Sequence, residues 1–292
     1  MAKVIDGKAI AADIRLNLQA KVEQHLKGGS RPPALSVVLV GEDPASKIYV
    51  EFKEKACEQI GMNTQTHRLP KETGESELLA LIDKLNADPS VDGILVQLPL
   101  PKQIDKLRIV GRISPIKDVD GLGAKNQGLL SLGLPGHRPC TPLGVMKLLE
   151  ATEVELTGKQ AAVIGRSILV GSPMVRLLTH ANATVQNIHS RTLNPAAIAC
   201  QADIIVAAAG VPELVKSEWV KPGAVLIDVG IHRINGSNKL VGDLAYKELE
   251  PKASHITPVP GGVGPMTIAM LLANCIQAYE WRLTGDHPYV YY

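Results

Sequence analysis

The chain has 292 residues, of which 45% are hydrophobic and 21% charged, and its formal net charge is +2. This length is sufficient for one large or two medium domains, each with its own core. The near-neutral charge gives no reason to expect nucleic acid or a membrane surface as a partner. The sequence starts without an apolar signal segment and has no apolar run of membrane-spanning length. These features predict a cytoplasmic globular enzyme.

The cysteines and histidines show no metal-binding spacing. The four cysteines are scattered and form no Cys-x-x-Cys pair, and the eight histidines form no His-Glu-x-x-His motif. We therefore expect neither a disulfide scaffold nor a metal site.

Residues 43–61 carry the start and stop signals of a helix. Asp43 can cap the N–H groups of the first turn, Pro44 suits the first helical position, and Gly61 suits a left-handed end. At about 100° per residue, the apolar side chains fill one broad arc. They are Ala45, Ile48, Tyr49, Val50, Phe52, Ala56, Cys57 and Ile60. Lys53 falls inside this arc, one turn after Tyr49. It either extends its amine to solvent along its stem or stays buried for a purpose.

The first half of the chain alternates predicted helices and strands. In chain order they are a helix at 8–27, a strand at 34–41, the helix at 43–61, a strand at 63–69, a helix at 75–87 and a strand at 91–101. This order is typical of a parallel sheet with helices on its faces, where ligands bind at the carboxyl ends of strands. Gln97 lies at such an end. The loop with Asp120 would lie at the same end if that segment crosses the same edge of the sheet.

Residues 121–139 are rich in glycine and proline and are interpreted as a linker. Thr141 and Pro142 then begin a helix through Glu150, which places the domain boundary near residue 140.

The second half opens with a strand at 160–164 that enters a glycine turn and then a helix through His180. A dinucleotide pyrophosphate binds at such a helix N-terminus. The fingerprint is imperfect, because Ser167 and Val170 replace its second and third glycines after Gly165. A tight turn without a ligand remains the alternative.

The next strand, at 183–189, ends in Ser190 and Arg191 without the carboxylate that NAD-selective folds commonly place there. With Arg166 in the glycine turn, these donors suit a 2′-phosphate and favour NADP over NAD. Solvated surface arginines are the alternative.

Strands at 203–210 and 224–230 both end in glycine, which permits close approach of a ligand to the backbone. Ile231 follows the second strand and could meet a nicotinamide through its main chain, or could simply be core. A glycine and proline loop at 258–267 leads into a last helix at about 266–283 and lacks the lysine of a P-loop.

Five motifs together resemble the bifunctional methylenetetrahydrofolate dehydrogenase/methenyltetrahydrofolate cyclohydrolase family, over about residues 3–285. They are Tyr49-x-x-x-Lys53 with Lys55-Ala56-Cys57, Gly93-Ile94-Leu95-Val96-Gln97-Leu98-Pro99-Leu100-Pro101, Lys117-Asp118-Val119-Asp120-Gly121, Gly165-Arg166-Ser167 with Val170-Gly171-x-Pro173, and Pro260-Gly261-Gly262-Val263-Gly264-Pro265-Met266-Thr267.

The resemblance implies an α/β fold with two domains flanking a cleft, each with a mainly parallel sheet. Residues 1–140 and 267–292 would form a folate-binding catalytic domain, to which the last helix returns. Residues 141–266 would form a Rossmann-type NADP-binding domain. A homodimer is also implied.

The implied reactions are oxidation of 5,10-methylenetetrahydrofolate by NADP+ to the methenyl cation, and hydration of that cation to 10-formyltetrahydrofolate. The residues implied to bind and process the folate are Tyr49, Lys53, Gln97 and Asp120, with Pro260 and Gly261 as further substrate contacts. Those implied to bind the cofactor are Gly165, Arg166, Ser167, Ser190, Arg191 and Ile231.

For the hydration step, we expect Lys53 to act as a neutral base, with the Gln97 amide N–H donating to its amine. Asp120 could hold the pterin, although an Asp-Gly turn is its alternative interpretation. Two other functions stay open at this point. One is a two-domain NADP oxidoreductase of the shikimate dehydrogenase type, and the other is a non-catalytic folate or nucleotide sensor.

Overall fold

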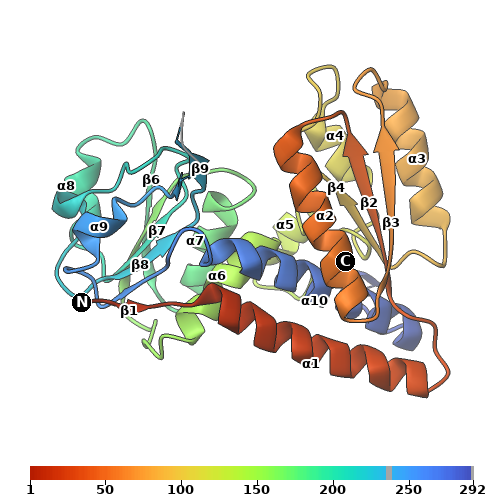
Figure 1. Ribbon diagram of the computed structural model, residues 1–292, viewed down its shortest axis with the longest axis horizontal. Helices are drawn as coiled ribbons and strands as arrows, with labels where there is room; N and C mark the ends of the chain where they lie inside the picture. Colours follow the sequence, from red (N-terminus) through yellow and green to blue (C-terminus); the bar gives the residue numbers. More distant parts are fainter. Residues whose placement is uncertain (235–238, 291–292) are drawn as a thin grey trace. The chain divides into compact units, whose positions relative to one another are not determined.

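The computed structural model describes residues 1–234 and 239–290 (Figure 1). The chain forms two compact units. The first unit comprises Met1–Ala12 and Thr141–Thr267, and the second comprises Asp13–Cys140 and Ile268–Tyr292.

The second unit is built on a three-stranded parallel sheet. Its strands are β2 (Ala34–Val40), β3 (Asn63–Leu69) and β4 (Gly93–Val96), in the order β3-β2-β4. The strands predicted at 34–41 and 63–69 are confirmed, whereas the strand predicted at 91–101 keeps only its first part. Pro99 and Pro101 cannot donate to a ladder, so regular pairing stops before them.

The helices of the second unit cover this sheet. The predicted α2 (Pro44–Gln59) and α3 (Glu75–Ala87) are confirmed, and Figure 1 shows both beside the strands. Shorter helices α4 (Lys106–Arg112) and α5 (Ala124–Ser131) follow. One face of the sheet packs on α3 and α4 through a buried cluster. The cluster includes Val38, Val40, Leu78, Ile82, Ile94, Val96 and Ile109.

The prediction of a linker at 121–139 is wrong, because helix α5 lies within that range. This helix lacks a strong apolar period. It is anchored instead by the side chain of Asn126, which is fully buried and donates a hydrogen bond to Asp118 at 2.8 Å.

Helix α2 starts and stops as predicted. The Asp43 carboxylate accepts a hydrogen bond from the Ser46 N–H at 2.8 Å, and Gly61 adopts φ +77° just after the helix. The predicted apolar arc is only half covered. Ile48 and Phe52 are 46% and 52% exposed, whereas Val50, Ala56 and Cys57 are buried.

The first unit is built on a six-stranded parallel sheet. Its order is β1-β11-β8-β7-β5-β6. The strands are β1 (Lys3–Val4), β5 (Gln160–Ile164), β6 (Thr184–Ile188), β7 (Ile204–Ala207), β8 (Val225–Asp228) and β11 (His255–Ile256). From β5 the chain first adds β6 on one side and later β7 on the other. This reversal is the topological switch point where dinucleotides bind in doubly wound sheets.

Helices and a small ribbon complete the first unit. The helices are α6 (Cys140–Glu150), α7 (Gly171–His180), α8 (Pro195–Ala199), η1 (Ser217–Trp219) and α9 (Tyr246–Leu249). The antiparallel ribbon pairs β9 (His232–Arg233) with β10 (Leu240–Val241). A buried cluster that includes Ile164, Ile205, Leu226 and Ile256 forms the core.

Two long helices join the units in sequence, α1 (Gly7–Lys27) and α10 (Val263–Thr284), with the short η2 (Pro288–Val290) after the latter. The first twelve residues cluster with the first unit. The reason is that β1 pairs with β11, placing Lys3 opposite His255.

Within residues 1–234 and 239–290, helices long and apolar enough to cross a membrane are absent.

Candidate active site

Lys53 lies on the buried face of α2 and is only 9% exposed. Of the two alternatives left by the sequence, the buried lysine is therefore the correct one. Its Nζ donates a hydrogen bond to Gln97 Oε1 at 2.8 Å, immediately after strand β4. The predicted direction of this bond is wrong. The Gln97 amide N–H donates instead to the Leu98 carbonyl at 2.7 Å, which leaves its oxygen facing the lysine.

A carboxylate lies close enough to Lys53 to influence its charge. Burial lowers the pKa of the Lys53 amine, while the Asp120 carboxylate acts in the opposite direction. Burial likewise raises the pKa of Asp120, and the Lys53 charge offsets part of this effect. Lysine, glutamine and aspartate from three separate segments thus form one group, which we call the Lys53 cluster.

A buried thiol that the sequence did not single out belongs to the same region. Cys140 is 1% exposed, and its Sγ donates to the Val119 carbonyl at 3.3 Å. Burial, followed by the charge of Asp120, raises the pKa of the thiol well above its usual value. The thiol is therefore uncharged at neutral pH, and its position just before Thr141-Pro142 is the only sequence signal it carries.

The loop that presents Asp120 is held by its neighbour Asp118. The Asp118 carboxylate, which is 1% exposed, accepts hydrogen bonds from the N–H groups of Gly123 at 2.8 Å and Leu122 at 3.3 Å. Burial raises the pKa of Asp118 to about 6. The Lys117-Asp118-Val119-Asp120-Gly121 motif was recognised in the sequence, but the supporting role of Asp118 was not.

Tyr49 lies one helical turn before Lys53 and is half-buried, which raises the pKa of its hydroxyl. Its ring is thus partly available to a ligand. Pro260 and Gly261 belong to the first unit, on the turn that precedes α10, where Gly261 adopts φ +105°.

The glycine turn of the first unit requires its glycines. Gly165 follows β5 with φ +127°, and a Cβ atom there would lie 2.2 Å from the Ala208 carbonyl oxygen. A Cβ atom at Gly171, the first residue of α7, would lie 2.3 Å from the Gly165 carbonyl oxygen. Asn187 on β6 also donates to that carbonyl, at 2.7 Å. These contacts fix a tight turn at the N-terminus of α7.

Four predicted cofactor residues surround the turn with exposed donors. Arg166 and Ser167 follow β5, and Ser190 and Arg191 follow the adjacent β6, so all four lie at the carboxyl edge of the sheet. Guanidinium and hydroxyl groups are the donors that phosphates prefer, and no carboxylate stands at the end of β6. The residues present therefore fit a phosphorylated dinucleotide. Ile231, which follows β8, is 46% exposed and is not a core residue.

A second group that the sequence missed lies at the same edge. Asp228 ends β8 and is 2% exposed, and Asp243 follows β10 and is fully buried. The Asp228 carboxylate accepts hydrogen bonds from the N–H groups of Gly230, Asp243 and Leu244, at 3.0, 2.8 and 2.9 Å. Burial raises its pKa to about 7. Neither aspartate belongs to a recognised motif.

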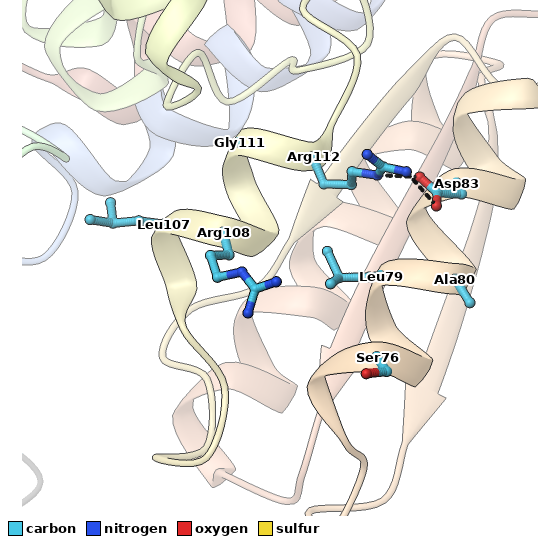
Figure 2. A pocket seen from close by; sticks show the side chains of 8 residues that line it. All are labelled: Ser76, Leu79, Ala80, Asp83, Leu107, Arg108, Gly111 and Arg112. Atoms are coloured by element: carbon cyan, nitrogen blue, oxygen red, sulfur yellow. Dashed lines mark hydrogen bonds and ion pairs between the residues drawn. The ribbon is translucent and has the colours of Figure 1, made fainter.

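The second unit also has a pocket that the residues of the Lys53 cluster do not line. Figure 2 shows it between α3 and α4, lined by Ser76, Leu79, Ala80, Asp83, Leu107, Arg108, Gly111 and Arg112. Its charges are already paired, since Arg112 Nε lies 2.5 Å from Asp83 Oδ1 and Arg108 Nη1 lies 2.5 Å from Glu75 Oε1. None of the predicted site residues lines it. We therefore assign it no role in the reaction.

Among residues 1–234 and 239–290, the His, Cys, Asp and Glu side chains form no group of three that could hold a metal ion.

A Rossmann-type sheet with donors suited to phosphate, together with a buried lysine beside a carboxylate, is the arrangement expected of a two-unit α/β enzyme that uses a dinucleotide. Residues 5–120 match the family model of the tetrahydrofolate dehydrogenase/cyclohydrolase catalytic domain, and residues 139–283 match that of the tetrahydrofolate dehydrogenase/cyclohydrolase NAD(P)-binding domain. The chain belongs to the tetrahydrofolate dehydrogenase/cyclohydrolase family.

Individual relatives agree along nearly the whole chain. The bifunctional protein FolD of Geotalea daltonii is 53% identical and covers 97% of this chain and 100% of its own. The crystal structure of FolD from Campylobacter jejuni superposes with a TM-score of 0.94 at 48% identity, over 97% of this chain and 100% of that chain. The Trypanosoma brucei FolD, solved with NADP and an inhibitor, has a TM-score of 0.93 at 38% identity, over 97% and 98% of the two chains.

The predicted family, α/β fold and bifunctional enzyme class are confirmed, and tetrahydrofolate derivatives are its substrates. The predicted cofactor, NADP, agrees with the NAD(P)-binding family model and with the NADP complex of the trypanosomal relative. The shikimate dehydrogenase alternative is not supported. Such an enzyme from Aquifex aeolicus, at 16% identity and a TM-score of 0.55 over 88% of this chain and 94% of that chain, shares the fold alone.

Proposed function

We propose that the chain oxidises 5,10-methylenetetrahydrofolate with NADP+ and hydrolyses the resulting methenyl cation to 10-formyltetrahydrofolate, using the Lys53 cluster for both steps. The observation that carries the assignment to these residues is the buried Lys53 amine, which donates to Gln97 at 2.8 Å beside the Asp120 carboxylate. Burial of an ionisable amine is costly in a structural role, and titratable groups with perturbed pKa values gather at functional sites.

The first step requires positioning. NADP+ supplies the hydride acceptor, and the carbon that loses the hydride becomes cationic. The protein needs no acid or base for this transfer. It must hold the methylene carbon close to the acceptor and keep water out. Tyr49, half-buried on α2, would supply an aromatic surface for the pterin or aminobenzoyl ring.

The second step requires a base. A water molecule attacks the methenyl carbon and must lose a proton, which gives a neutral hydroxy adduct. The bond from that carbon to N5 then breaks as the hydroxyl proton passes to N5, and the formyl group is left on N10. A charged lysine would oppose the cation, because two positive charges about 4 Å apart repel by roughly 4 kcal/mol at an effective dielectric near 20. Burial lowers the pKa of Lys53 and so favours the neutral amine. Its N–H bond to Gln97 then leaves the nitrogen lone pair free to accept the proton from water.

Asp120 would bind the aminopyrimidine edge of the pterin. Its carboxylate can accept two N–H bonds from that edge, and the hydrogen bonds that Asp118 makes to Leu122 and Gly123 fix its loop. The N–H donors of the bound pterin would also partly offset the negative charge of the Asp120 carboxylate. Without them, this charge favours the ammonium form of Lys53. Substrate binding would thereby help to keep the amine neutral. Pro260 and Gly261 would add backbone contacts to the substrate.

The cofactor would bind at the switch point of the first unit. The pyrophosphate would lie against the turn of Gly165, Arg166 and Ser167 at the N-terminus of α7. Ser190 and Arg191 would bind the 2′-phosphate, and the main chain of Ile231 would meet the nicotinamide. The chain would act in the cytoplasm as a homodimer, with neither nucleic acid nor a membrane as a partner. These finer assignments rest on the resemblance and the charge balance alone.

One assay tests the proposed function. Purified protein is mixed with methylenetetrahydrofolate and NADP+, and the absorbance of the methenyl product is followed over time. We expect a rise that depends on NADP+, followed by a decay as the cation is hydrolysed. A sensor would bind NADP+ without turnover, and either the absence of a rise or turnover of a hydroxy acid alone would refute the proposal.

A further inference from the structure

Three loops meet at the carboxyl edge of the sheet in the first unit, after strands β5, β7 and β8. The loop after β5 contains Gly165, whose backbone packs directly on the loop after β7, since a Cβ atom on Gly165 would lie 2.2 Å from the Ala208 carbonyl oxygen. The loop after β8 contains Ile231. Gly165 and Ile231, which are proposed to bind the cofactor, lie on the first and third of these loops. Binding of the cofactor therefore requires contacts that hold the three loops together.

A single carboxylate joins the second and third loops. Asp243 is fully buried, and its Oδ2 accepts hydrogen bonds from the N–H groups of Ala209 at 2.6 Å and Gly210 at 2.9 Å. Its Oδ1 lies 2.7 Å from His232 Nε2. A carboxylate oxygen is the acceptor in this pair and the imidazole N–H is the donor, so His232 donates here. The His232 side chain is 20% exposed. Asp243 thus forms hydrogen bonds both with the loop after β7 and with His232, the residue that follows Ile231.

The backbone around Asp243 leaves it little freedom. A Cβ atom on Gly230 would lie 2.2 Å from Asp243 Oδ1, so the loop after β8 passes against the carboxylate. The N–H of Asp243 itself donates to Asp228 Oδ1 at 2.8 Å, at the end of β8. The carboxylate is therefore held in place by the sheet and in turn holds the loops.

We infer that Asp243, together with His232, positions the loops that carry Gly165 and Ile231 and so sets the geometry of the bound dinucleotide at its nicotinamide end. This inference rests on the proposed assignment of the cofactor to these loops. Asp243 is a positioning residue, because its carboxylate oxygens are occupied by protein donors and it acts on the cofactor through the backbone of residues 208–210 and 230–232. It contributes to dinucleotide binding and to hydride transfer, and not to hydration of the methenyl cation.

A purely structural brace would behave differently. Its loss would lower the stability of the whole unit without separating the two activities. The chain offers a matched control for this case in Asp203, at the opposite end of β7. The Asp203 carboxylate accepts hydrogen bonds from the Gln160 N–H at 2.9 Å and from Lys221 Nζ at 2.6 Å, so it has a comparable number of donors far from the carboxyl edge.

The test compares Asp243→Asn, His232→Ala and His232→Gln with Asp203→Asn and the unaltered chain. Calorimetric titration gives the Kd for NADP+, and separate assays give the dehydrogenase and cyclohydrolase rates, the latter started from the methenyl substrate. We expect the Kd for NADP+ to rise about tenfold in Asp243→Asn and His232→Ala, since a hydrogen bond to a charged group is lost. The dehydrogenase kcat should fall with it, while the cyclohydrolase kcat/KM stays within about twofold.

His232→Gln keeps an N–H donor and should restore the NADP+ affinity to within about twofold of the unaltered chain. If Asp243→Asn fails to fold, the two His232 variants carry the test. An NADP+ affinity unchanged in His232→Ala, equal losses of both activities, or an equal effect of Asp203→Asn would overturn the inference. Absence of both activities from the unaltered chain would instead refute the proposed function, and the calorimetric comparison would still decide the role of Asp243.

Discussion

Lys53 Nζ lies 2.8 Å from Gln97 Oε1, and the lysine is the donor. Helix α2 supplies the amine and the end of strand β4 supplies the amide, so two segments that are 44 positions apart in sequence define the polarity of the site. Because the amide presents its oxygen, it orients an amine N–H and leaves the lone pair of the neutral amine available. This arrangement is compatible with the proposed role of Lys53 as a base.

Replacement of that lysine should separate the two activities. In Lys53→Met the apolar stem is kept and the base is lost, so cyclohydrolase activity should fall by about 10²-fold or more, while part of the hydride transfer remains. Both rates are measured on the same preparation. Lys55→Met, at an exposed position of the same helix, is the control and should leave both rates unchanged. Equal loss of the two activities in Lys53→Met would count against a base.

Neutralising the carboxylate next to this amine should act on substrate binding. In Asp120→Asn, one acceptor oxygen and the charge are lost, and we expect folate affinity to weaken by about 10- to 100-fold, since hydrogen bonds to charged groups contribute about 1.5–3 kcal/mol. Fluorescence titration with a folate analogue measures this directly. Glu58→Gln, exposed on α2, provides the comparison. An affinity equal to that of the unaltered chain would remove Asp120 from the site.

Discrimination between the two dinucleotides should depend on Arg191. This exposed guanidinium at the end of β6 is expected to bind the 2′-phosphate, which NAD lacks. Arg191→Ala should therefore weaken NADP+ binding by about tenfold and leave NAD+ binding nearly unchanged. Arg176→Ala, exposed on α7, should affect neither cofactor. Parallel weakening of both cofactors in Arg191→Ala would reject the phosphate contact.

Stability in the second unit should depend on pH through His137. The side chain is fully buried, its Nε2–H donates to the Ile116 carbonyl at 2.9 Å, and its ring lies 4.7 Å from that of Trp281. Burial lowers its pKa to about 4. Since the unfolded chain binds a proton below about pH 6.5 and the folded chain does not, the histidine contributes stability above pH 6.5 that is lost as pH falls toward 4.

His137→Gln should remove this dependence. Denaturant unfolding would measure the stability difference between the two chains at pH 7.5, 6 and 4.5. We expect the unaltered chain to be more stable at pH 7.5, and the difference to shrink on acidification by up to about 3 kcal/mol. A difference that stays constant or grows as the pH falls would show that His137 does not titrate in this way.

Local sequence signals determined the ends of the regular elements. Asp43 and Gly61 bracket α2 because a cap and a left-handed glycine act through neighbouring backbone groups only. The motif residues of the candidate site were identifiable for a similar reason, since each motif is a short continuous stretch. The helix α5 was missed because a buried polar contact of Asn126, not an apolar period, holds it in place.

Whether Lys53 is buried, and which atom of Gln97 faces it, was decided only by the tertiary structure. The sequence placed the lysine in an apolar arc, but the sheet covers part of that arc and leaves Phe52 exposed. Asp243 and His232 carry no local signal at all, because their hydrogen bonds join segments that are distant along the chain. Periodicity reports which side of an element is apolar, whereas charge state and loop geometry depend on neighbours that only the folded chain brings together.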